Sequence, residues 1–144
     1  MTKRPEELQN VSLPVNGNDR VVLVVEDELA LRAMIRRLLQ REGYTVLEAD
    51  NGAHALRVLE GAADRPVELV LTDVRMPLMG GRELAAALAR SQPGLPVVLM
   101  SGFTAQLREI QLISPHLALL SKPFRDHDLL ASIRAHLGRS TEPL

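Results

Sequence analysis

The residues in this sequence with the clearest capacity for chemistry stand at the ends of short aliphatic runs. Four such runs, VVLVV, ELVLT, PVVLM and HLALL, are followed within two residues by a carboxylate, a hydroxyl or an ammonium group. The residues concerned are Glu26, Asp27, Asp73, Ser101 and Lys122. If the runs are parallel strands, their carboxyl ends meet at one edge of a sheet, which is where ligands bind in such folds. We therefore expect these side chains to lie close together.

The charge of this set favours a bound cation. Glu26, Asp27 and Asp73 bring three negative charges and Lys122 brings one positive charge, so the carboxylates would repel one another in a partly dry site. A divalent ion with oxygen ligands would offset the excess, and magnesium suits such a set because it takes one or two carboxylates and keeps several waters. A nucleophile, a metal and a cation are the parts that phosphoryl transfer needs. An aspartate can itself be the nucleophile and form an acyl phosphate.

The elements that must position these residues alternate regularly along the chain. Continuous aliphatic runs predict buried strands, and apolar residues on one face predict amphipathic helices. Strands are predicted at residues 21–25, 45–48, 68–72, 96–100 and 116–120, and helices near 31–39, 51–59, 82–90, 105–113 and 129–137. Five successive β-then-α units predict an α/β fold, a doubly wound parallel sheet with helices on both faces.

The composition fits a single globular domain. The chain has 144 residues, of which 46% are hydrophobic and 24% charged, so it is long enough to bury a core. Aromatic residues make up 2%, which predicts an aliphatic core. We place the domain at residues 20–138, a flexible tail or linker at 1–19 and a C-terminal tail at 139–144.

Charge and residue usage disfavour several classes of protein. The net charge is −1 and there is no long basic run, so a nucleic-acid surface is not expected. Cysteine is absent, which excludes disulfides, thiolate metal sites and thiol nucleophiles. No apolar run is long enough to span a bilayer and the N-terminus lacks a signal-peptide pattern, so we expect no membrane insertion and a cytoplasmic location.

The motifs VLVVEDE, VLTDVRMPLMGG, VVLMSGF and LLSKPF, in this order, resemble those of response regulator receiver domains from two-component signalling. The resemblance covers roughly residues 20–137. It implies a flavodoxin-like (βα)5 sheet with strand order 2-1-3-4-5. It also implies that Asp73 accepts a phosphoryl group from the phosphohistidine of a histidine kinase or a histidine phosphotransfer domain. Such a domain is a phosphoacceptor rather than an enzyme, although it promotes its own phosphorylation and slow dephosphorylation.

The resemblance also assigns roles around Asp73. It implies Mg2+ as the cofactor, with Asp27 as a direct ligand, Glu26 as a ligand through water and the backbone carbonyl of Arg75 as a further ligand. Ser101 would bond a phosphoryl oxygen after transfer. Lys122 would pair first with the carboxylate and then with the phosphoryl group, and the Lys122–Pro123 bond would be cis.

Output is expected through protein contacts. Phosphorylation adds charge and three acceptor oxygens, so it would draw Ser101 and Lys122 inward and change a surface that a downstream protein reads. A homodimer is a further expectation of the resemblance. One position departs from the family: Leu119 stands where receivers usually carry Tyr or Phe. The run MPLMGGRELA, together with LMSGF, is similar to receivers attached to hybrid histidine kinases. SLPVNGNDR, which precedes the domain, resembles the linker that follows the ATP-binding domain of those kinases.

Other interpretations stay open for the individual residues and for the whole chain. Each polar residue alone could be an ordinary helix-start, turn or surface residue. A haloacid-dehalogenase-type hydrolase would need a D-x-D pattern, but the first run ends in Glu26-Asp27-Glu28. A nucleotide-binding module would need a glycine-rich phosphate loop, which is absent. A degenerate receiver that acts as a phosphorylation-independent interaction module is the main alternative.

Overall fold

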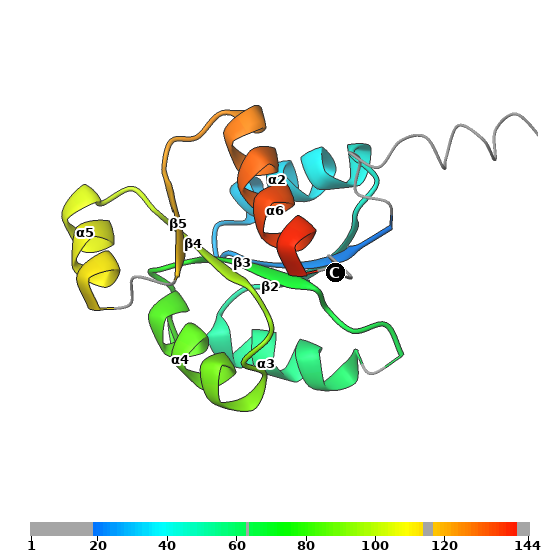
Figure 1. The fold of residues 1–144 in the computed structure, drawn as a ribbon, viewed down its shortest axis with the longest axis horizontal. Helices are drawn as coiled ribbons and strands as arrows, with labels where there is room; N and C mark the ends of the chain where they lie inside the picture. Colours follow the sequence, from blue (N-terminus) through cyan, green and yellow to red (C-terminus); the bar gives the residue numbers. More distant parts are fainter. Residues whose placement is uncertain (1–18, 63, 114–116, 141–144) are drawn as a thin grey trace, which may run out of the picture.

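The computed structural model describes residues 19–62, 64–113 and 117–140, which form a five-stranded sheet wrapped by helices (Figure 1). All strands are parallel and their order is β2-β1-β3-β4-β5. The strands are β1 (Val21–Val25), β2 (Thr45–Ala49), β3 (Leu69–Asp73), β4 (Val97–Ser101) and β5 (Ala118–Ser121). This confirms the predicted doubly wound α/β fold and the strand order that the resemblance implied.

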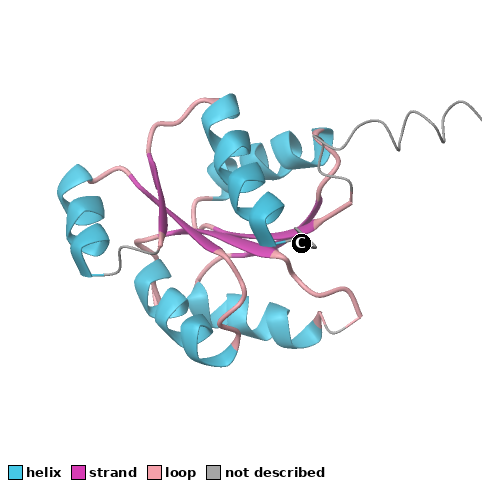
Figure 2. Ribbon diagram, in the orientation of Figure 1, coloured by secondary structure: helices cyan, strands magenta, loops and turns pink. Residues whose placement is uncertain are grey.

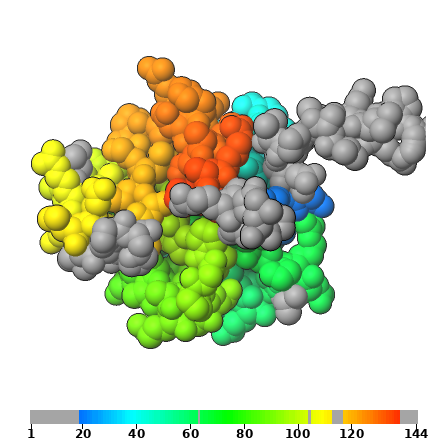
Figure 3. Space-filling view, in the orientation of Figure 1, coloured from blue at the N-terminus to red at the C-terminus, as the bar shows by residue number. Residues whose placement is uncertain are grey.

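Helices cover both faces of the sheet, as Figure 2 shows. They are α2 (Leu29–Arg41), α3 (Gly52–Gly61), α4 (Gly81–Ser91), α5 (Thr104–Ile113) and α6 (Asp126–Ser140). Helices α2 and α6 lie on one face, where Leu39 and Ile133 pack with Val22 of β1. Helices α3 and α4 lie on the other face, and Ile110 of α5 joins the core on that side. In the space-filling view, α5 forms one end of the molecule (Figure 3).

The central strands are buried because helices cover them on both sides. Every residue of β1, β3 and β4 is buried, as expected of continuous aliphatic runs in a parallel sheet. The edge strands β2 and β5 are partly exposed. Glu26, Asp73 and Ser101 are therefore positioned by the ends of the three buried strands.

Local signals in the sequence explain where several elements begin and end. Gly43 has a φ of 95°, a left-handed conformation that suits glycine just after α2. The side chain of Asn51 accepts a hydrogen bond from the His54 N–H at 2.9 Å and caps α3. Both features agree with the predicted helix boundaries.

Some predicted boundaries differ from the structure by a few residues. Strands β3 and β4 lie one residue further along than predicted, so Asp73 and Ser101 are the last strand residues rather than the first loop residues. Helix α6 continues to Ser140, beyond the predicted domain end at residue 138. His116, the predicted start of the fifth strand, and the tail residues 1–18 and 141–144 lie outside the described residues. Within the described ranges, no helix is both long enough and apolar enough to cross a bilayer.

Candidate functional site

The predicted acidic residues meet at the carboxyl edge of the sheet. Carboxylate oxygens of Glu26, Asp27 and Asp73 lie within 4.8 Å of one another. Glu26 is 1% exposed and Asp73 is 9% exposed, whereas Asp27 lies open to solvent. The ends of β1 and β3 bring these side chains together because the two strands are hydrogen-bonded neighbours. The convergence inferred from the strand ends is therefore present in the structure.

Lys122 connects the two buried carboxylates. Its Nζ lies 3.2 Å from Glu26 Oε1 and 3.3 Å from Asp73 Oδ1. The Lys122 N–H donates to the Ser101 carbonyl at 2.8 Å, which fixes the start of the loop after β5 beside the end of β4. The Lys122–Pro123 bond is cis, as the resemblance implied.

The site holds more negative charge than its lysine offsets. Burial raises the pKa of Glu26, and the charge of Asp73 raises it further, against the lowering effects of the Glu28 N–H and Lys122. Burial also raises the pKa of Asp73, and the charge of Asp27 adds to this, while Lys122 and the Val74 N–H oppose it. Burial alone would lower the pKa of Lys122, but the charges of Asp73 and Glu26 together outweigh it and raise the pKa. The two buried carboxyls are thus unfavourably placed as anions unless a further cation binds.

The donor set fits Mg2+. It offers oxygen atoms alone, from three carboxylates that one ion could reach, and one of them, Asp27, is open to the solvent that would supply water ligands. Glu26, Asp27 and Asp73 are the residues that would hold the ion. The role of the Arg75 backbone carbonyl as a further Mg2+ ligand stays a prediction.

Backbone contacts orient the Asp73 side chain. The Val74 N–H donates to Asp73 Oδ1 at 2.9 Å, and Lys122 approaches the same oxygen. The Thr72 hydroxyl donates to the Asp73 carbonyl at 2.9 Å, and Gly81, the first residue of α4, lies against that carbonyl. The carboxylate therefore stands on a backbone fixed from several sides.

We expect Gly81→Ala to destabilise the domain by about 1–3 kcal/mol. A Cβ at this position would overlap the Asp73 carbonyl oxygen and lie 3.0 Å from Leu99 Cδ2, and a backbone carbonyl cannot rotate away as a side chain can. Chemical denaturation measures the loss. Gly61→Ala is the matched control, because a Cβ there meets nothing within 4 Å and alanine favours the helix. Equal stability of the two variants would contradict the close approach of α4 to Asp73.

Ser101 is the predicted site residue whose hydroxyl bonds to partners other than the acidic cluster. Its side chain is 2% exposed. Ser101 Oγ donates to Gln106 Oε1 at 3.0 Å and accepts from the Phe103 N–H at 3.0 Å. Among the described residues, no hydrogen bond joins this hydroxyl to Asp73 or Lys122. Ser101 thus lies at the site without contacting the predicted phosphoacceptor.

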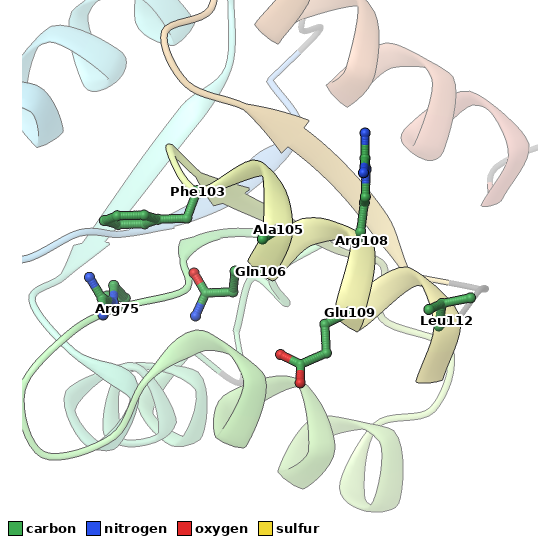
Figure 4. Close-up of a pocket in the computed structure, with 7 residues that line it drawn as sticks. All are labelled: Arg75, Phe103, Ala105, Gln106, Arg108, Glu109 and Leu112. Carbon is green, nitrogen blue, oxygen red and sulfur yellow. The ribbon is translucent and has the colours of Figure 1, made fainter.

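Sequence reasoning missed Phe103 and Gln106, the two hydrogen-bond partners of the Ser101 hydroxyl. The Arg75 guanidinium carbon lies 4.4 Å from the centre of the Phe103 ring, a cation–π contact between the loops after β3 and β4. These two residues and Gln106 line one open pocket, drawn in Figure 4. The available signal was the position of Gln106 in the first turn of the helix that follows Ser101. Leu119, at the usual aromatic position, is partly buried and packs against the core on the α3–α4 side.

Comparisons with known proteins agree with this geometry. The family model of the response regulator receiver domain matches residues 22–134. Response regulator receiver protein CpdR of Brucella abortus is 36% identical over 117 residues, which cover 81% of this chain and 95% of CpdR. Response regulator MprA of Mycobacterium ulcerans is 40% identical over 120 residues, which cover 83% of this chain and 50% of MprA. The chain thus spans about half the length of several curated relatives that it matches.

Solved structures show the same fold. The CheY-like response regulator receiver domain protein from Methanospirillum hungatei superposes with a TM-score of 0.75 at 26% identity, covering 85% of this chain and 96% of that one. A response regulator receiver domain protein from Clostridium thermocellum also gives a TM-score of 0.75, at 25% identity, covering 83% of this chain and 95% of that one. The chain therefore belongs to the response regulator receiver domain family of two-component systems.

Proposed function

We propose that Asp73 accepts a phosphoryl group from the phosphohistidine of a histidine kinase or a histidine phosphotransfer domain, with Mg2+ as cofactor. The observation that carries the proposal is Lys122, whose ammonium lies between the buried carboxylates of Glu26 and Asp73 while Asp27 completes an oxygen-only cluster. A nucleophile, a fixed cation and a metal-binding set thus stand in one place. The proposal rests on this geometry together with membership of the family.

In the proposed reaction, a carboxylate oxygen of Asp73 attacks the phosphorus of the donor. The bond from phosphorus to the donor imidazole nitrogen breaks, its electron pair stays on that nitrogen, and Asp73 becomes an acyl phosphate. Glu26, Asp27 and Asp73 would hold Mg2+, whose positive charge would offset the charge of the phosphoryl oxygens. Lys122 stabilises the developing charge from a fixed position, and the Val74 N–H holds the carboxylate in orientation.

Phosphorylation would then change what the loops after β3, β4 and β5 bind. It replaces one negative charge on Asp73 by nearly two and adds three acceptor oxygens. Ser101 and Lys122 are the donors that can turn toward these oxygens. We propose that the resulting movement alters a surface read by a downstream protein, in the cytoplasm and without direct contact with nucleic acid, and that this surface also supports a homodimer. The domain itself acts as a signalling acceptor and not as an enzyme with a separate substrate.

The test is the mass of the intact protein after incubation with acetyl phosphate and Mg2+. We expect a gain of one phosphoryl group that hydroxylamine removes, because an acyl phosphate is cleaved by this nucleophile whereas a phosphoserine is not. We expect no gain when EDTA sequesters the metal. A protein that stays unmodified in the presence of Mg2+ would favour the interaction module without phosphorylation, and a hydroxylamine-resistant product would place the group on another type of residue.

A further inference from the structure

The single proton of the Ser101 hydroxyl is already engaged in the structure. The hydroxyl donates this proton to Gln106 Oε1 at 3.0 Å, and it accepts from the Phe103 N–H at 3.0 Å. The side chain is 2% exposed, so water has little access to replace either partner. A hydroxyl can donate one hydrogen bond at a time. Ser101 therefore cannot bond a phosphoryl oxygen on Asp73 until it leaves Gln106.

Gln106 connects this hydroxyl to a helix. It lies in the first turn of α5, and the next turn carries Leu107 and Ile110, which are both buried. Because the glutamine side chain joins the end of β4 to α5, its release removes a polar contact that helps fix the start of the helix. Figure 4 shows Gln106 beside Arg75 and Phe103, where the loops after β3 and β4 meet.

We propose that Gln106 is a positioning residue, a latch that holds the Ser101 hydroxyl away from Asp73 and links its release to the start of α5. The inference rests on the proposed function, since it assigns Ser101 a resting and a phosphoryl-bound orientation. Leu119 cannot provide such a link by hydrogen bonding, because its side chain is apolar and packs, partly buried, against the core. In this chain the polar connection between the site and a surface helix runs through Gln106 instead.

The latch lowers the affinity of the site for a phosphoryl group. The hydrogen bond between Ser101 and Gln106 must first break, so the apparent affinity is the intrinsic affinity multiplied by the fraction of molecules in which Ser101 is already released. A single hydrogen bond between neutral groups shifts such an equilibrium by about two- to tenfold. Removing the acceptor should therefore tighten the binding of a phosphoryl mimic by that factor.

Calorimetric titration of the full chain with beryllium fluoride and Mg2+ tests this. Gln106→Met keeps an unbranched side chain but lacks the acceptor, and we expect its Kd to be about two- to tenfold lower than that of the native chain. Gln106→Ala should show the same gain. Gln111→Met is the matched control, because Gln111 is an exposed residue of the same helix, and its Kd should stay unchanged.

A double-mutant cycle separates a latch from a general effect on α5. In a Ser101→Ala background the hydroxyl is gone, so Gln106→Met should leave the Kd unchanged. Equal or weaker binding by Gln106→Met and Gln106→Ala, or the same gain with and without the Ser101 hydroxyl, would overturn the latch while leaving phosphorylation of Asp73 in place. A native chain that binds neither Mg2+ nor the mimic would instead overturn the proposed function, and the latch with it.

Discussion

Asp73→Asn is expected to abolish the gain of one phosphoryl group on incubation with acetyl phosphate and Mg2+. The amide has nearly the same shape as the carboxylate, but its oxygen is a poor nucleophile and it cannot form an acyl phosphate. It also removes one of the three charges in the proposed magnesium site. Removal of a nucleophile that forms a covalent intermediate costs orders of magnitude in rate, so the modified fraction should fall below detection. Intact-protein mass spectrometry measures it.

Asp64→Asn is the matched control for this substitution. Asp64 is an exposed aspartate in the turn before β3, outside the acidic cluster, and its amide variant should gain the phosphoryl group as the native chain does. Circular dichroism of both variants checks that the fold is intact. A phosphorylated Asp73→Asn protein would show that another residue is the acceptor.

Lys122→Met is expected to destabilise the domain by about 3 kcal/mol at neutral pH and to slow phosphoryl uptake by about 100-fold. The Lys122 ammonium contacts both Glu26 and Asp73. Its removal leaves two largely buried carboxylates without this compensating positive charge. The stability loss lies at the low end for a buried pair because the lysine side chain is 22% exposed. Chemical denaturation and a time course of mass gain measure the two effects.

The stability loss in Lys122→Met should depend on pH. The folded-state pKa of Glu26 and Asp73 is already raised by burial, and removal of the ammonium raises it further. At a pH low enough to protonate both carboxyls in the folded protein, no buried anion is left without its cation and the variant should approach native stability. The loss should then grow as the pH rises through the folded-state pKa values, because the unfolded chain ionises more easily than the fold.

Arg37→Met provides the comparison for charge alone. Arg37 is an exposed residue of α2, and its substitution removes one positive charge from the surface. Its effect on stability should stay within about 0.5 kcal/mol and should not vary with pH in the acid range. If Lys122→Met behaved in the same way, the ammonium would have no special role between the two carboxylates.

The layout of the site could be predicted from sequence because strand periodicity and strand ends are local signals. VVLVV leading into Glu26 and Asp27 and the run leading into Asp73 were sufficient to place three carboxylates at one sheet edge. The strand order came from the family resemblance, since periodicity alone does not determine which strands are neighbours. The one-residue shifts of β3 and β4 reflect hydrogen bonding that continues past the last apolar side chain.

The orientation of Ser101 could not be predicted in the same way. A serine hydroxyl at a strand end can turn toward several partners at similar cost, and its choice of Gln106 depends on where α5 lies in three dimensions. The same holds for the contact of Arg75 with Phe103, which joins two loops far apart in sequence. Such contacts are set by tertiary packing, and no periodic pattern encodes them.

Because of the strand order, Asp73 and Lys122 are held by different numbers of neighbouring strands. Asp73 ends β3, a strand that pairs with β1 on one side and with β4 on the other. Lys122 follows the edge strand β5, which among the described residues pairs only with β4, so displacing β5 deforms a single ladder. The proposed nucleophile therefore lies at the end of a central strand, while the lysine that would respond to phosphorylation follows an edge strand. If Asp73 is phosphorylated, the loop after β5 should therefore shift more readily than the end of β3.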